Sequence, residues 1–277
     1  MPEPLHDSSL FMTTPIALTI AGSDSSGGAG IQADLKTFAA LGVYGASVIT
    51  ALTAQNTQGV SGIHPVPAEF VTAQIDAVFS DLAVSAVKIG MVAQPAVMDA
   101  IVAGLTRWSP KHVVLDPVMV ATSGDRLLAT EAVEALRGKL IPRAAVITPN
   151  LPEAAALLDE PVATSESAVE DQGRRLLAMG CKAVLIKGGH GQGRESIDYL
   201  IDANDVIVLA APRVATRNTH GTGCSLSSAI AAGLAKGESL EVAVRNAKAF
   251  VSAAISAADR FSVGHGHGPI HHFQKYY

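Results

Sequence analysis

The sequence has few aromatic residues, few cysteines and no excess of positive charge, and each shortage excludes a class of protein. Aromatic side chains make up only 4% of its 277 residues, too few for a surface on which nucleic-acid bases stack. The formal net charge of −5 offers no basic patch for nucleic acid or an acidic membrane surface. The two cysteines, Cys181 and Cys224, do not form a disulfide framework, which favours a reducing compartment. We therefore expect a cytoplasmic protein that binds neither nucleic acid nor membrane.

Long apolar runs and linker-like stretches are also missing. No apolar run approaches the ~20 residues that a membrane-spanning helix needs. The N-terminal residues lack the basic start of a signal peptide, and Leu10-Phe11-Met12 is too short for its apolar core. No Pro/Ser-rich or charged tract interrupts the rest of the chain, and 48% of the residues are hydrophobic, enough for a large core. The sequence thus predicts a flexible tail over residues 1–14 and a single domain over residues 15–277.

Patterns typical of buried strands alternate with patterns typical of helices along the chain. The expected strands cover residues 16–21, 47–54, 85–89, 112–117, 145–148 and 183–187, followed by a hairpin of residues 199–201 and 206–209. The expected helices cover residues 31–38, 68–80, 96–107, 129–140, 166–179, 226–234 and 238–259. This alternation predicts an α/β fold with a mostly parallel sheet and helices on both faces. Cys181, which precedes one strand, is interpreted as a small buried apolar residue.

The most informative stretch is Asn218-Thr219-His220-Gly221-Thr222-Gly223-Cys224-Ser225, which leads directly into a helical pattern. Gly221 and Gly223 can adopt backbone angles closed to other residues, so that successive N–H groups can converge on one point. The first turn of a helix also has unpaired N–H groups and the positive end of the helix dipole. Together these features indicate an anion site, for which the usual anion is phosphate. The alternative is an ordinary glycine turn capped by Thr222 or Ser225.

A second glycine-rich loop, residues 22–30, joins the first strand to the first helix. Gly22 and Gly27 have the spacing of a nucleotide phosphate loop, but Gly28 and Ala29 stand where Lys and Ser or Thr are required. The loop is therefore interpreted as one that approaches a small polar substrate, with a tight strand–helix turn as the alternative. Gln55, at the expected end of the next strand, could read the edge of a heterocycle because its amide both donates and accepts.

Polar or flexible residues follow the ends of the predicted parallel strands, which meet at the same edge of the sheet. They are Gly22, Gln55, Met91, Asp116, Asn150, Glu153, Lys187 and the loop 221–224. Taken singly, Asp116 could cap a helix and Lys187 could be a solvated strand end. Residues 150–153 could start a helix with Pro152 in its first turn. Together they predict phosphoryl transfer, in which carboxylates hold hydrated Mg²⁺, a lysine neutralises phosphate and a glycine loop stabilises the transferring group.

Six blocks of sequence, in order, carry a resemblance to one family. They are residues 21–34, 53–57, 88–91, 115–119, 148–153 and 218–224, and the likeness extends from Ile16 to His271-His272. The chain is similar to the hydroxymethylpyrimidine/phosphomethylpyrimidine kinases of thiamine biosynthesis, within the ribokinase-like superfamily. The resemblance implies a three-layer sandwich and an enzyme that uses ATP and Mg²⁺. Its substrates would be 4-amino-5-hydroxymethyl-2-methylpyrimidine and then the monophosphate of that compound.

The resemblance also implies roles for particular residues. The aminopyrimidine pocket would involve Gly22, Asp34, Gln55, Met91 and Val118. Nucleotide contacts would come from Asn150, Lys187 and Thr219, metal contacts from Asp116 and Glu153, and catalytic contacts from Gly221, Thr222, Gly223 and Cys224. Cys224 would lie at the acceptor hydroxyl. We also expect a homodimer, a state that none of these residues determines by itself.

Two other functions stay open at this point. Cys224 stands where most ribokinase relatives and many pyridoxal kinases have Asp, which favours a pyrimidine kinase, yet some relatives with this cysteine also accept pyridoxal-type substrates. A vitamin B6 kinase is therefore the first alternative, and a non-catalytic pyrimidine-binding regulator is the second. A pure sensor would not need the anion loop, Asp116 and Glu153. If Cys224 is a general base, the helix dipole is expected to lower the pKa of its thiol towards neutrality.

The histidine-dense stretch over residues 264–272 could suggest a metal site. Related kinases end with a similar stretch, and it contains neither cysteine nor carboxylate. We interpret it as a structural tail.

Overall fold

The computed structural model describes residues 14–119, 129–189 and 193–277, so residues 1–13 of the expected tail lie outside the described part. Eight of its strands form one sheet with the order β10-β9-β8-β7-β6-β5-β1-β2. These strands are β1 (Ile16–Ala21), β2 (Tyr44–Ile49), β5 (Ala86–Ile89), β6 (His112–Leu115), β7 (Val146–Ile147), β8 (Ala183–Ile186), β9 (Glu195–Asp202) and β10 (Val206–Pro212). β9 is antiparallel to β8 and β10, and all other neighbours are parallel. The predicted mostly parallel sheet and its terminal hairpin are confirmed.

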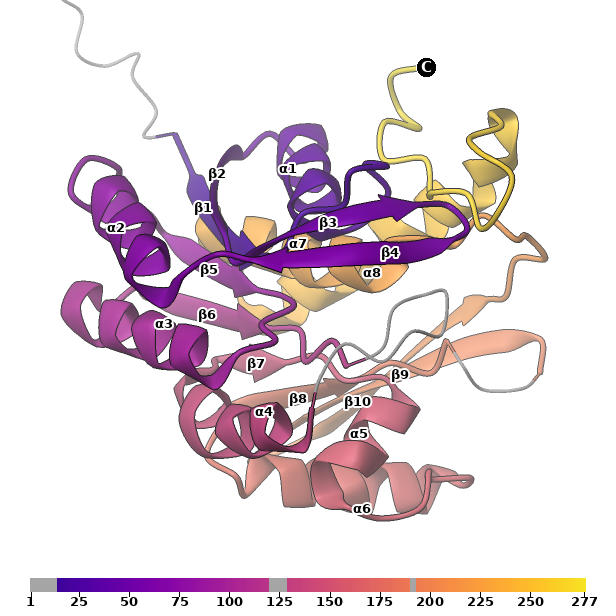
Figure 1. Cartoon of the computed structure of the whole chain (residues 1–277). Helices are drawn as coiled ribbons and strands as arrows, with labels where there is room; N and C mark the ends of the chain where they lie inside the picture. Colours follow the sequence, from indigo (N-terminus) through magenta and orange to yellow (C-terminus); the bar gives the residue numbers. More distant parts are fainter. Residues whose placement is uncertain (1–13, 120–128, 190–192) are drawn as a thin grey trace, which may run out of the picture.

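Helices cover both faces of this sheet and produce three layers (Figure 1). One face is covered by α2 (Ala68–Phe79), α3 (Pro95–Trp108), α4 (Thr130–Ala135), α5 (Leu151–Leu158) and α6 (Glu166–Leu177). The other is covered by α1 (Gly30–Ala40), α7 (Thr222–Ala235) and α8 (Leu240–Ser256). Among the described helices, none is long and apolar enough to cross a membrane.

The alternation of side chains along the central strands divides the core into two parts. Val87 and Ile89 of β5 belong to the core under α2 and α3, whereas Ala86 belongs to the core under α1 and α7. The same alternation turns Lys88, and Thr19 of β1, towards α1 and α7. A polar pair is thereby placed in the interior, close to the carboxyl ends of the strands.

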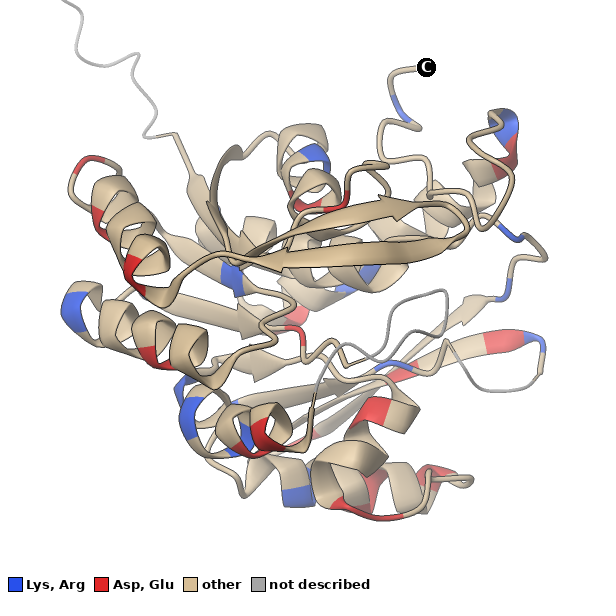
Figure 2. Ribbon diagram, viewed as in Figure 1, with Lys and Arg blue, Asp and Glu red and all other residues tan. Residues whose placement is uncertain are grey.

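The prediction of one strand over residues 47–54 is wrong. β2 ends at Ile49, and β3 (Ala51–Asn56) pairs instead with β4 (Gly59–Pro65) in a separate two-stranded sheet. Thr50 anchors the break, because its N–H donates to the carbonyl of Ala21 (3.0 Å) and its hydroxyl to that of Met91 (3.0 Å). The hairpin contains no Lys, Arg, Asp or Glu, whereas charged residues are spread over the surrounding helices (Figure 2). Gln55 therefore lies within this hairpin and not at an end of the main sheet.

Smaller differences concern the ends of elements. β7 has two residues, fewer than the predicted 145–148. The helix predicted over residues 129–140 is α-helical only to Ala135 and continues as a π-helical turn, η2 (Leu136–Leu140), and a 3₁₀ turn, η3 (Ile141–Arg143). The helix predicted to reach residue 259 ends at Ser256 and is followed by η4 (Ala258–Arg260). Cys181 is 6% exposed, which confirms its prediction as a buried residue.

Candidate active site

A cavity of about 750 Å³ is lined by the loops that follow the parallel strands. Its lining includes all the residues that the sequence placed at the site, except Asp34. They are Gly22, Gln55, Met91, Asp116, Val118, Asn150, Glu153, Lys187, Thr219, Gly221, Thr222, Gly223 and Cys224. The carboxyl ends of neighbouring strands thus converge as expected.

The glycine loop begins α7. Gly221 precedes the helix with a φ of 81°, a left-handed conformation that favours glycine. In the described chain no side chain caps this helix start: the Thr222 hydroxyl donates to the carbonyl of Thr219 (2.6 Å), and the Ser225 hydroxyl pairs with His272 (2.8 Å). The alternative of a turn capped by Thr222 or Ser225 is therefore wrong. The start of α7 has the features of an anion site.

Two carboxylates and a lysine lie opposite this loop. Lys187 Nζ is 2.8 Å from Asp116 Oδ1 and 3.8 Å from Glu153 Oε2. A Cβ atom on Gly223 would lie 3.3 Å from Lys187 Nζ and 3.8 Å from Asp116 Oδ2, so the glycine loop and the charged cluster meet. An anion at the start of α7 would therefore lie beside a lysine ammonium.

Burial and mutual attraction act in opposite directions on this cluster. Burial opposes the ionisation of Asp116, but Lys187 and Lys88 hold the pKa of this carboxyl below its usual value. Burial raises the pKa of Glu153 to about 7, against the attraction of Lys187. Burial also disfavours the Lys187 ammonium, but Asp116 and Glu153 raise its pKa above the ordinary value. Asp116 and Lys187 are therefore oppositely charged at neutral pH, and Glu153 is the more readily protonated carboxyl.

Asn150 and Glu153 also start helix α5, as the alternative interpretation of this segment expected. The Asn150 N–H donates to Glu153 Oε2 (2.7 Å), and the Glu153 N–H donates to Asn150 Oδ1 (2.8 Å). This reciprocal arrangement is a capping box, with Pro152 in the first turn. The cap fixes the orientation of the Glu153 carboxylate, so the structural and functional interpretations are compatible.

The donor set fits magnesium bound together with nucleotide. Mg²⁺ is usually held by one or two protein carboxylates, while water and substrate phosphates supply the other ligands. Asp116 and Glu153 provide two such carboxylates beside the anion loop. No group of three or more His, Cys, Asp or Glu that could hold a metal occurs among the described residues.

On the side of the cavity where the aminopyrimidine is expected, Gly22 lies close to Met91, and Gln55 lies close to Thr53. A Cβ atom on Gly22 would lie 2.6 Å from Met91 Cε, so glycine leaves the space that the methionine occupies. The Thr53 hydroxyl lies 3.2 Å from the amide oxygen of Gln55, within reach for donation. These contacts set one wall of the cavity in advance of any ligand.

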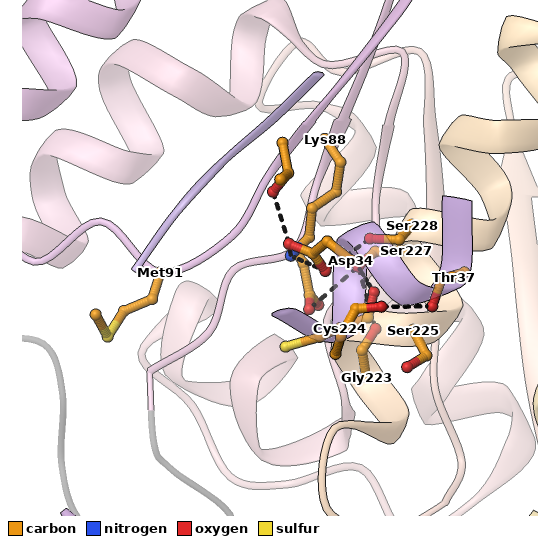
Figure 3. A network of polar contacts seen from close by, with 12 residues as sticks. Asp34, Thr37, Lys88, Met91, Gly223, Cys224, Ser225, Ser227 and Ser228 are labelled. Atoms are coloured by element: carbon orange, nitrogen blue, oxygen red, sulfur yellow. Dashed lines mark hydrogen bonds and ion pairs between the residues drawn. The ribbon is translucent and has the colours of Figure 1, made fainter. Parts of the chain in front are cut away.

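The position of Asp34 differs from the expectation. It is completely buried and accepts from Thr19 Oγ1 (2.6 Å), Ser228 Oγ (2.7 Å) and Lys88 Nζ (2.8 and 2.9 Å) (Figure 3). A carboxylate has about four lone-pair sites, so these four bonds use its capacity. Lys88 lines the cavity in its place. The available signal was a lysine inside the otherwise apolar run of residues 86–89.

A second pair that the sequence did not reveal joins the two glycine loops. His220 Nε2 lies 2.8 Å from Asp24 Oδ2, and Asp24 also accepts from the N–H groups of Ser26, Gly28 and Ala29. Burial opposes the ionisation of Asp24, but these bonds hold its pKa well below the usual range. Both residues lie within the quoted motifs, yet only the fold brings them together.

The pKa expected for Cys224 is wrong. Burial raises the pKa of its thiol to about 11, although Lys88 acts in the opposite direction. Desolvation of the thiolate therefore outweighs the attraction of the Lys88 ammonium.

The far end of the cavity combines apolar and polar contacts. Lys248 Nζ is 2.7 Å from Asp198 Oδ2, and Val251, Ser252 and Ile255 of α8 complete the wall. No sequence pattern indicated this end of the cavity, because α8 and β9 meet only in the folded chain.

Known proteins match nearly the whole chain. The family model described as phosphomethylpyrimidine kinase matches residues 24–271. The hydroxymethylpyrimidine/phosphomethylpyrimidine kinase of Rhizobium meliloti is 58% identical over 264 residues, which are 95% of this chain and 99% of the relative. The solved phosphomethylpyrimidine kinase of Clostridium difficile is 46% identical, with a TM-score of 0.77 over 87% of this chain and 99% of its own. The pyridoxal kinase of Bacillus subtilis, solved with ADP, is 35% identical, with a TM-score of 0.86 over 94% and 98%. The chain therefore belongs to the phosphomethylpyrimidine kinase family.

Proposed function

We propose that the chain is an ATP-dependent kinase with two successive activities. It phosphorylates the hydroxymethyl group of 4-amino-5-hydroxymethyl-2-methylpyrimidine and then the resulting monophosphate, which yields the diphosphate for thiamine biosynthesis. The observation that carries this proposal is the contact between the glycine loop at the start of α7 and the Lys187–Asp116 pair, within one cavity. The names of the relatives support the same activity.

The residues that line the cavity have different roles in the two phosphoryl transfers. In each step an acceptor oxygen bonds to the γ-phosphorus of ATP while the bond from that phosphorus to the ADP oxygen breaks. The N–H groups of residues 221–224 stabilise charge on the transferring phosphoryl group, and Lys187 neutralises adjacent phosphate charge. Asp116 and Glu153 would hold magnesium, which would supply positive charge to the phosphates. Gly22, Gln55, Met91 and Val118 surround the aminopyrimidine, with Cys224 near the acceptor.

A vitamin B6 kinase is the second candidate, because the Bacillus subtilis relative with the same fold is a pyridoxal kinase. ADP release should be measured with ATP, Mg²⁺ and each of three acceptors: the aminopyrimidine, its monophosphate and pyridoxal. We expect turnover with the first two, and mono- and diphosphate products by mass spectrometry. Turnover with pyridoxal but with neither pyrimidine acceptor would establish a vitamin B6 kinase. Tight aminopyrimidine binding without any turnover would establish a regulator.

We also propose that the chain forms a homodimer in the cytoplasm. Light scattering should then give twice the chain mass of 28.4 kDa. A single-chain mass at micromolar concentration would exclude the dimer.

A further inference from the structure

Lys88 is a buried charge that faces the cavity and that the proposed mechanism does not yet use. Its side chain is completely buried, and it belongs to the cavity lining together with Asp116 and Cys224. Replacing a buried ion pair with apolar side chains is often neutral or even stabilising, so stability alone is a weak reason for such a pair. A buried charge in a cleft is instead a candidate for a functional group.

The ammonium of Lys88 is held in one place. Both oxygens of Asp34 accept from it, at 2.9 and 2.8 Å, while Thr19 and Ser228 complete the bonds of Asp34 (Figure 3). These four side chains come from β1, α1, β5 and α7, so the cation is fixed by both the sheet and the helix that begins at the anion loop. A lysine has three N–H donors, of which Asp34 uses two, and within the described parts of the chain the third has no further hydrogen-bond acceptor.

The surroundings of Lys88 place its charge near the point of transfer. A Cβ atom on Gly90 would lie 2.7 Å from Lys88 Nζ, so this glycine leaves room for the ammonium just before Met91, on the substrate side. On the other side, Lys88 shares the cavity lining with Asp116 and Cys224, and its charge favours the ionised form of both groups. The ammonium therefore lies between the aminopyrimidine wall and the phosphate-binding cluster.

We propose that Lys88 is a further catalytic residue of the proposed kinase, whose ammonium contacts the acceptor group, and that Asp34, Thr19 and Ser228 are its positioning residues. This inference rests on the proposed function. In the first step the alcohol oxygen bonds to the γ-phosphorus and its proton passes to an oxygen of the transferred phosphoryl group, while the bond to the ADP oxygen breaks. Lys88 keeps its own proton and stabilises the negative charge that develops on the acceptor oxygen.

The two acceptors should respond differently to the loss of this charge. The alcohol is neutral until the transition state, so the interaction with Lys88 strengthens during the reaction and contributes to kcat. The monophosphate is already anionic at neutral pH, so the same interaction exists in the ground state and contributes mainly to KM. A purely structural lysine would not produce this split.

The test uses Lys88→Met combined with Asp34→Asn, which removes both charges and leaves no unpaired ion, and Lys88→Gln as a second variant. Lys139→Met, which breaks the exposed ion pair with Asp99 (2.6 Å), is the matched control. Urea unfolding checks the fold, and kcat and KM are measured on each acceptor with ATP saturating. We expect kcat on the alcohol to fall about 10²-fold or more, and KM for the monophosphate to rise about ten- to a hundredfold. The control should match wild type.

Folded variants with kcat and KM within a few-fold of wild type, or with equal losses on both acceptors, would overturn the role of Lys88. If both variants fail to fold, the role is structural and the inference is equally overturned. A wild type that phosphorylates neither acceptor would overturn the proposed function itself, so the two failures are distinguishable.

Discussion

At the start of α7, the Cys224 thiol is subject to two opposite influences. The helix dipole and the Lys88 ammonium favour the thiolate, whereas burial disfavours it and raises the pKa to about 11. With that pKa, only about one thiol in 10⁴ is ionised at pH 7. A thiolate base is therefore rare in the free enzyme, and Cys224 is better described as part of the pocket wall.

The first prediction concerns the pH dependence of the two phosphorylations. Because the thiol stays protonated, the rates of wild type and Cys224→Ala should have the same shape between about pH 6 and pH 9. Cys224→Ala should slow both steps by similar factors, since it changes packing alone. The measurement is a pH–rate profile for each acceptor. A rise near neutral pH in wild type that Cys224→Ala lacks would restore the thiol as a base.

Glu153→Gln separates the two roles of Glu153. Glutamine at this position keeps the capping box of α5, so the stability of the protein should stay close to wild type. The substitution removes a carboxylate from the proposed magnesium site, so half-maximal activity should require more Mg²⁺. Activity is titrated with Mg²⁺ at fixed ATP, and urea unfolding serves as the control. An unchanged magnesium requirement would remove Glu153 from metal binding.

Among the elements, the two glycine loops are packed directly against each other. A Cβ atom on Gly221 would lie 1.9 Å from the carbonyl oxygen of Gly28, and the φ of 81° adds backbone strain. Gly221→Ala should therefore destabilise the protein, by roughly 1–3 kcal/mol from strain alone. Gly223→Ala should cost little, because the nearest atom to its Cβ would be Lys187 Nζ at 3.3 Å. Urea unfolding of both variants compares them, and equal stabilities would mean that the loops separate easily.

The C-terminal segment, residues 264–272, packs onto these loops. His272 Nε2 pairs with Ser225 Oγ (2.8 Å), the His220 N–H donates to the carbonyl of Gly268 (3.0 Å), and the His267 N–H donates to that of Thr57 (2.9 Å). The segment therefore joins the start of α7 to the β3–β4 turn. These contacts support the interpretation of the histidine-dense stretch as structural.

His272 should make stability depend on pH. Burial, with help from Lys36 and His271, lowers the pKa of His272 from 6.5 to about 4. The unfolded chain thus binds a proton at His272 more readily than the folded chain does. The neutral His272 therefore contributes fully to the free energy of unfolding above pH 6.5, and this contribution is lost as the pH falls towards 4. Between about pH 7.5 and pH 5 this loss is about 2 kcal/mol.

The measurement for His272 is urea unfolding at these two pH values. His272→Gln should lose less stability on acidification than wild type, whereas His64→Gln, a change at an exposed histidine of β4, should follow wild type. Equal pH dependence in wild type and His272→Gln would contradict the lowered pKa.

For the whole molecule, one cavity contains the residues that we propose for both substrates. Its lining extends from Gln55 of the β3–β4 hairpin, past Asp116, to Lys248 and Ile255 of α8. We therefore expect both substrates to bind together and the phosphoryl group to pass directly between them. Initial rates at varied ATP and aminopyrimidine should give intersecting double-reciprocal lines. Parallel lines would instead indicate a phosphorylated enzyme intermediate.

Most of the fold could be predicted because its signals are local. Buried strands are recognised as short apolar runs. Helices such as α2 and α6 are recognised by apolar residues that recur about every 3.6 positions. The β3–β4 hairpin could not be predicted in this way, because Ala51–Asn56 continues the sequence pattern of β2. Only the pairing of β3 with Gly59–Pro65 shows that β3 is a separate strand. Register and partner choice depend on residues distant in sequence.

The candidate site shows the same division between local and distant information. The residues at strand ends were predictable, because parallel strands end at one edge and carry their loops there. The sequence by itself therefore determined the α/β fold, the family and a set of candidate site residues of which all but Asp34 line the cavity. Tertiary structure alone decided the state of individual groups: the buried Asp34–Lys88 pair, the raised pKa of Cys224 and the Asp24–His220 contact. The physical reason is that burial and charge pairing depend on atoms brought together from different elements, and no local pattern records those distances.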